Sequence, residues 1–189
     1  MKQIYFILLV LIVFSCKDKE KPKLNDVKIS KTKFEFNRIK FSDIKKIEEE
    51  NNGIQFTKPI NITLSKDYFP EIDKYEFEQP KIFVRDTLNM ETTVSYFFTK
   101  KDSVVRLIEY SWNQGRKKGR KKEPFIDDLY NFNKVEISKS LKQSGEEKSE
   151  KVDYWWQKII RWDNDSTHIY SFIFGMEKGQ RTRVIIRYK

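Results

Sequence analysis

The sequence predicts an α+β fold, an antiparallel β-sheet with two helices packed on one of its faces. The 189 residues include 15 Phe, 9 Tyr and 4 Trp but only 6 Gly and 5 Pro, a balance that suits a strand-rich core. Residues 34–114 and 123–189 each combine a helical pattern with strand patterns, which suggests two tandem helix-plus-meander halves of a single domain. Two helices over one sheet face form the simplest arrangement that buries this many aromatic side chains.

A short helix is expected after Phe34. Ser42 suits the N-cap, Ile44 and Ile47 stand at helical spacing, and Gly53 suits the end of the helix. The acidic residues that close this pattern oppose the helix dipole.

Strands are expected at Ile60–Leu64 and Lys81–Thr87, followed by a hairpin over Thr92–Trp112 that turns at 101–103. One face of the hairpin is predicted to carry Val94, Tyr96 and Phe98 on the first arm and Val104, Ile108, Tyr110 and Trp112 on the second, interrupted by Arg106.

The second half begins with a predicted main helix. Pro124 suits its first position, Asp127 and Asp128 suit its first turn, and Gly145 lies near its end. A strand starting near Val135 is the alternative.

A three-strand meander is predicted to follow, over Val152–Trp162, Thr167–Phe174 and Arg181–Tyr188. In its last strand, apolar residues alternate with arginines, which predicts one apolar and one basic face.

The N-terminus has the pattern of an export signal. Lys2 precedes an apolar run from Ile4 to Phe14, then Ser15 and Cys16, the only cysteine. The run is shorter than the roughly 20 residues of a transmembrane helix and within the roughly 7–15 of a signal-peptide core.

Residues 13–16, Val-Phe-Ser-Cys, resemble the lipobox of bacterial lipoproteins. This resemblance implies a signal peptide over 1–15 and a lipid on Cys16. The residues that follow are rich in lysine and lack apolar periodicity, which predicts a charged tether over 16–33 and one domain over 34–189. Residues 17–20, Lys-Asp-Lys-Glu, are similar to the surface-export signal of Bacteroidota lipoproteins. The resemblance implies attachment to the outer membrane, with the periplasmic or the surface face left open.

The formal net charge of +10 predicts attraction to anionic lipids, anionic glycans or acidic proteins. Nucleic acid is not an expected partner of an exported protein. Two candidate anion- or partner-binding sites follow. The first is the loop cations Arg116, Lys117, Lys118, Arg120, Lys121 and Lys122, and the second is Arg161, Arg181, Arg183 and Arg187 near Trp155. The alternative is a solvated loop and the wet side of a sheet.

The sequence names no catalytic residue, metal site or cofactor. His168 is the only histidine, which leaves too few ligands for an ordinary zinc site or a di-histidine metal cluster. Residues 163–165 resemble a calcium loop only in part, because His168 occupies the position that needs glycine. The carboxylate pairs 127–128 and 146–147 are sequence neighbours and point in different directions.

We therefore expect a non-enzymatic, lipid-anchored envelope protein that binds a macromolecular partner or an anionic envelope component through a basic surface. The alternative is an envelope hydrolase or transferase acting on a glycan or peptide, with carboxylates assembled by the fold. A concave pocket with two converging carboxylates would favour the alternative.

Overall fold

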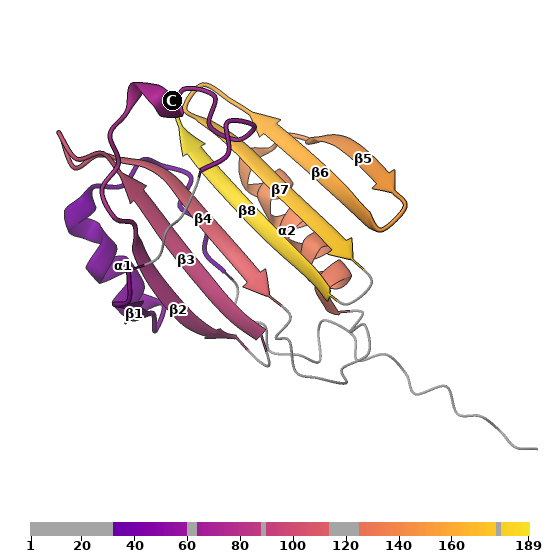
Figure 1. Cartoon of the computed structure of the whole chain (residues 1–189), viewed down its shortest axis with the longest axis horizontal. Helices are drawn as coiled ribbons and strands as arrows, with labels where there is room; N and C mark the ends of the chain where they lie inside the picture. The colour runs from indigo at the N-terminus through magenta and orange to yellow at the C-terminus, as the bar shows by residue number, and fades with distance from the viewer. Residues whose placement is uncertain (1–31, 60–63, 88–89, 114–124, 177–178) are drawn as a thin grey trace, which may run out of the picture.

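The computed structural model describes residues 32–59, 64–87, 90–113, 125–176 and 179–189. They form one open eight-stranded antiparallel sheet with strand order β1-β2-β3-β4-β8-β7-β6-β5 (Figure 1). The strands are β1 (Ile54–Phe56), β2 (Lys81–Thr87), β3 (Met90–Phe98), β4 (Val105–Asn113), β5 (Glu146–Val152), β6 (Trp155–Asp163), β7 (Thr167–Met176) and β8 (Gly179–Tyr188). The helices are α1 (Ile44–Glu50) and α2 (Phe125–Leu141), with short 3₁₀ turns η1 (Phe41–Asp43) and η2 (Ile72–Lys74). The prediction of an antiparallel sheet accompanied by two helices is confirmed.

The sheet is joined at its centre by the pairing of β4 with β8, where Tyr110 stands opposite Val184. Strands β1–β4 follow α1 in the chain, and strands β5–β8 follow α2. The two four-stranded groups therefore meet at the β4–β8 pair, with β1 and β5 at the outer edges of the sheet (Figure 1).

One face of the sheet carries the larger core. Alternating side chains of β3, β4, β7 and β8 lie there, including the fully buried Tyr96, Tyr110 and Val184. Helix α1 adds Ile44 to this cluster, and helix α2 adds Ile126, Leu129, Tyr130 and Ile137. Trp162 of β6 also packs there and donates a hydrogen bond from its indole nitrogen to Ser138 Oγ at 3.2 Å.

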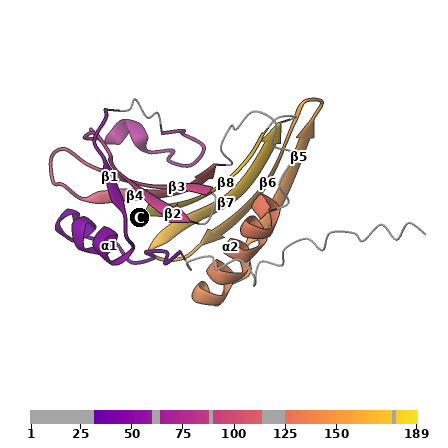
Figure 2. The same cartoon turned by 90° about the horizontal axis from the view of Figure 1, so that it is seen from below.

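The opposite face is covered in part by the segment 64–77, which contains η2. Phe69 is only 2 % exposed, and it belongs to a second cluster with Phe97, Leu107, Tyr170, Phe172 and Ile185. The ring of Tyr68 stacks on that of Phe172 with centroids 5.2 Å apart. Figure 2 shows this segment above the sheet and the two helices below it.

Several local predictions are confirmed. Strand β2 has the predicted bounds, the hairpin and the last three strands are present, and residues 125–141 are helical, so the strand alternative at Val135 is wrong. The predicted strand at 60–64 falls largely outside the described residues, and Leu64 is not in a strand.

Three local predictions are wrong. Ser42 does not cap the helix; it lies in η1, and its hydroxyl bonds to Asp43. Val104 does not share the hairpin face, because a bulge at Phe97/Phe98 shifts the register and Val105 takes that place. Val152 ends β5 rather than starting the meander, and this edge strand was not predicted because all seven of its side chains are exposed.

Candidate functional site

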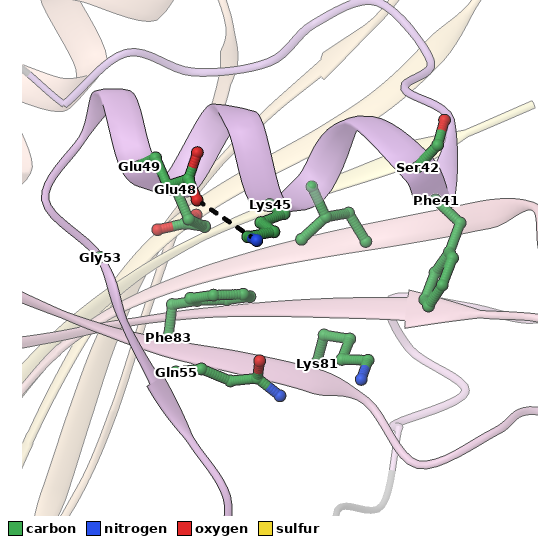
Figure 3. A pocket seen from close by; sticks show the side chains of 10 residues that line it. Phe41, Ser42, Lys45, Glu48, Glu49, Gly53, Gln55, Lys81 and Phe83 are labelled. Carbon is green, nitrogen blue, oxygen red and sulfur yellow. Dashed lines mark ion pairs between the residues drawn. The ribbon is translucent and has the colours of Figure 1, made fainter.

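The structure has a pocket between helix α1 and strands β1 and β2 (Figure 3). Its volume is about 430 Å³, within the usual range for small-molecule sites, roughly 300–1,000 Å³. It is lined by Phe41, Ser42, Ile44, Lys45, Glu48, Glu49, Gly53, Gln55, Lys81 and Phe83. Sequence analysis did not identify this pocket, because its walls meet only in the folded chain.

Glu48 is held in a buried ion pair at one end of the pocket. Arg85 Nε lies 2.9 Å from Glu48 Oε2, and Arg85 Nη2 lies 2.6 Å from Glu48 Oε1. The hydroxyl of Tyr96 also donates to Glu48 Oε1. Glu48 is 1 % exposed and Arg85 5 % exposed. Such a bidentate, charge-assisted arrangement is among the strongest polar contacts in proteins.

The ionisation of Arg85 and Tyr96 is set by their buried surroundings. Burial disfavours the charge of Arg85, but the hydrogen bonds and the negative charge of Glu48 outweigh it and raise the pKa of Arg85. Burial also raises the pKa of Tyr96 far above its ordinary value, so its hydroxyl keeps the proton that it donates.

Two carboxylates line the pocket, but they do not converge. Glu48 and Glu49 are neighbours on a helix, so their side chains project about 100° apart. Both oxygens of Glu48 are occupied by Arg85, while Glu49 is exposed and pairs with Lys45 at 3.7 Å. The arrangement does not supply the facing acid and base that glycoside hydrolysis needs.

Two of the predicted arginines have partners inside the fold. Arg187 is 7 % exposed, with Nη1 3.3 Å from Glu71 Oε2 and its guanidinium 5.6 Å from the Phe69 ring centroid. Arg183 Nη1 lies 3.4 Å from Glu109 Oε1. The segment 64–77 thus covers a part of the sheet face that the sequence predicted to be basic and wet.

The other two predicted arginines stand over aromatic rings on the same face. Arg161 lies 5.6 Å from the ring centroid of Tyr170, and its side chain is 49 % exposed. Arg181 lies 4.4 Å from the ring centroid of Phe174, which is half-buried. Arg161 Nη2 also lies 3.4 Å from Asp163 Oδ2, so this guanidinium is held at the surface by both a ring and a carboxylate.

The remaining predicted site residues, Cys16 and the six loop cations between 116 and 122, lie outside the described residues. Within the described ranges no group of three or more His, Cys, Asp or Glu side chains could hold a metal ion. No helix in the same ranges is long and apolar enough to cross a membrane.

The predicted turn at Asp163 is built around an asparagine. Asn164 Oδ1 accepts hydrogen bonds from the backbone nitrogens of Ser166 and Thr167, each at 2.9 Å. His168 follows in β7 with Nδ1 2.7 Å from Asp163 Oδ2. Burial and the nearby charge of Arg187 lower the pKa of His168, against the opposite effect of Asp163.

Comparison with protein-family models, with curated proteins and with solved structures found no match for this chain.

Proposed function

We propose that this chain is a lipid-anchored protein of the cell envelope whose domain binds an anionic macromolecule, either an acidic glycan or an acidic protein. The observation that carries the proposal is the pair Arg161 and Arg181 on one sheet face. Each guanidinium is supported by an aromatic ring, and Arg161 is half exposed to solvent. Forked donors in fixed positions suit repeated carboxylates or sulfates.

Binding has more support than catalysis. In the pocket beside α1, one carboxylate is bound by Arg85 and the other pairs with Lys45 at the surface. A hydrolase or transferase acting on glycan or peptide would need two carboxylates facing one substrate. The binding proposal requires cations at the surface, and the side chain of Arg161 is half exposed there.

Other parts of the chain would present the arginine-bearing sheet face to its partner. Cys16 would carry the lipid in the outer membrane, and the charged tether would let the domain reach its partner. The two helices would form the fixed cover of the opposite face, and the loop cations between 116 and 122 would add long-range attraction.

Titration of alginate oligosaccharides, as a carboxylate-rich glycan, tests the proposal on the full-length protein in nanodiscs of zwitterionic lipid. Replacing Arg161 and Arg181 by Ser should weaken binding about tenfold at low salt, because two charge-assisted contacts are lost. Unfolding in urea should confirm that the variant is folded.

The matched control replaces Lys46 and Lys139 by Ser, two exposed cations on α1 and α2. It removes the same charge from the opposite side of the molecule, so binding should change by no more than about twofold. Equal weakening by both double variants would mean that only net charge matters, and the sheet-face site would be abandoned.

A further inference from the structure

The pocket between α1, β1 and β2 is built mainly from apolar side chains. Ile44 and Phe83 are 3 % and 6 % exposed and belong to the main core. Phe41 packs on Phe98 with ring centroids 4.5 Å apart, which fixes the third apolar wall. A preformed apolar cavity with a few polar groups at its edges is the usual form of a small-molecule site.

The charged side chains of the pocket differ in whether they have an ion-pair partner. Glu48 is bound by Arg85, and Lys45 pairs with Glu49 at 3.7 Å. Lys81 of β2 is half-buried, and its ammonium lies 5.9 Å from the ring centroid of Phe41. Among the residues that the structure describes, no carboxylate lies within ion-pair distance of Lys81. The pocket therefore has one cation available for an incoming anion.

The cation and the carboxylates lie at different ends. Figure 3 shows Phe41 and Lys81 at one end of the pocket and Glu48, Glu49 and Gly53 at the other. An anionic group would be attracted to the Lys81 end, away from the two carboxylates. The apolar body of the same molecule would lie along Ile44 and Phe83.

We propose that this pocket binds a small amphipathic carboxylate, with its carboxylate at Lys81 and its apolar chain against Phe41, Ile44 and Phe83. The volume of about 430 Å³ excludes a polymer or a two-chain lipid as the whole occupant. One available ammonium matches a single negative charge better than the charge of about −1.5 to −2 on a phosphate monoester. This site is distinct from the arginine-bearing sheet face, and its occupant is a small molecule.

Calorimetric titration of the full-length protein in nanodiscs tests the proposal, with empty nanodiscs as the blank. Octanoate, octanol and octylammonium share one chain and differ in head-group charge, and octyl phosphate adds a phosphate. Octanoate should bind about three- to tenfold more tightly than octanol, because of one charge-assisted contact at a partly exposed lysine. Octylammonium should bind more weakly than octanol.

Lys81→Met should reduce the octanoate-to-octanol affinity ratio to about one and leave octanol binding almost unchanged, whereas Lys81→Arg should keep the preference. Gln55→Trp should weaken all these ligands, because Gln55 is an exposed wall residue whose replacement fills the pocket without disturbing the core. Lys46→Met, on α1 but outside the pocket, is the matched control and should change nothing. The proposal is overturned by equal binding of octanoate and octanol, by a ratio unaffected in Lys81→Met, or by tighter binding of octyl phosphate than of octanoate.

Discussion

Arg85 and Glu48 form a two-contact ion pair that joins strand β2 to helix α1, with Nη2 2.6 Å from Oε1 and Nε 2.9 Å from Oε2. Tyr96 donates to the same carboxylate, and Arg85 lies 5.9 Å from the ring centroid of Tyr110. Helix α1 has only seven residues, too few to be stable alone in water. The ion pair and Ile44 therefore hold it against the sheet.

Glu48→Gln should destabilise the protein by about 3–5 kcal/mol, because the buried Arg85 charge loses its partner. Urea unfolding followed by tryptophan fluorescence measures this loss. Glu49→Gln, one residue further on and exposed, should cost no more than about 0.5 kcal/mol. Similar losses in the two variants would show that the buried pair has no special role.

Gly53→Ala should destabilise the protein through the same ion pair. A Cβ atom at Gly53 would stand 2.1 Å from Glu48 Oε2, so the carboxylate would have to move away from Arg85. We expect a loss of about 2 kcal/mol. In the double variant with Glu48→Gln, the cost should be less than the sum, since both changes disturb one contact. Additive losses would contradict this coupling.

The sequence was sufficient to predict the elements whose side chains alternate. The hairpin of β3 and β4 and the meander of β6, β7 and β8 show this pattern, and β2 has its predicted bounds. Strand β5, Glu-Glu-Lys-Ser-Glu-Lys-Val, has no apolar alternation and is a strand because it pairs with β6 at the sheet edge. A charged edge strand of this kind protects a sheet from unwanted pairing.

The sites depended on contacts between distant parts of the chain. Arg187 meets Glu71, 116 residues away, and so belongs to the interior rather than to a basic surface. Glu48 meets Arg85, 37 residues away. The sequence held one local signal of the Glu48 contact, the acidic C-terminal turn of α1. Negative charge there is unfavourable for the helix dipole, and Glu48 is compensated by its contact with Arg85 on β2.

His168 should make stability depend on pH just below neutrality. Its folded pKa lies below the ordinary 6.5 because burial, Arg187 and Lys189 together outweigh Asp163. Between the folded pKa and about 6.5, the unfolded chain binds a proton on His168 that the folded chain does not. The contribution of His168 to stability is therefore full above about pH 6.5 and falls as the pH drops towards the folded pKa. Urea midpoints at pH 7.5 and 5.5 should therefore differ more in the wild type than in His168→Gln. Equal differences would contradict this assignment.

Cys16→Ser should leave the chain unprocessed at the lipidation step. The apolar run ends at this cysteine after a small residue, and the chain has no other cysteine to carry a lipid. Metabolic labelling with a fatty-acid analogue should mark the wild type and not the variant, whose apparent mass should be that of the uncleaved precursor. Ser15→Thr is a control that retains the cysteine. A variant that matures normally and still partitions into detergent would show that Cys16 is not the anchor.

Replacing the six cations of the loop at 116–122 by Ser should weaken association but not folding. Six like charges within residues 115–122 repel one another, so the segment gains more from a nearby polyanion than from compaction. Urea unfolding should shift only slightly, since surface substitutions usually cost no more than about 0.5 kcal/mol each. Wild-type binding to alginate should weaken steeply from low salt to 0.15 M, where exposed charges are screened beyond about 8 Å, and the variant should bind less and lose most of this dependence. Unchanged binding with an unchanged salt dependence would assign the interaction to Arg161 and Arg181 alone.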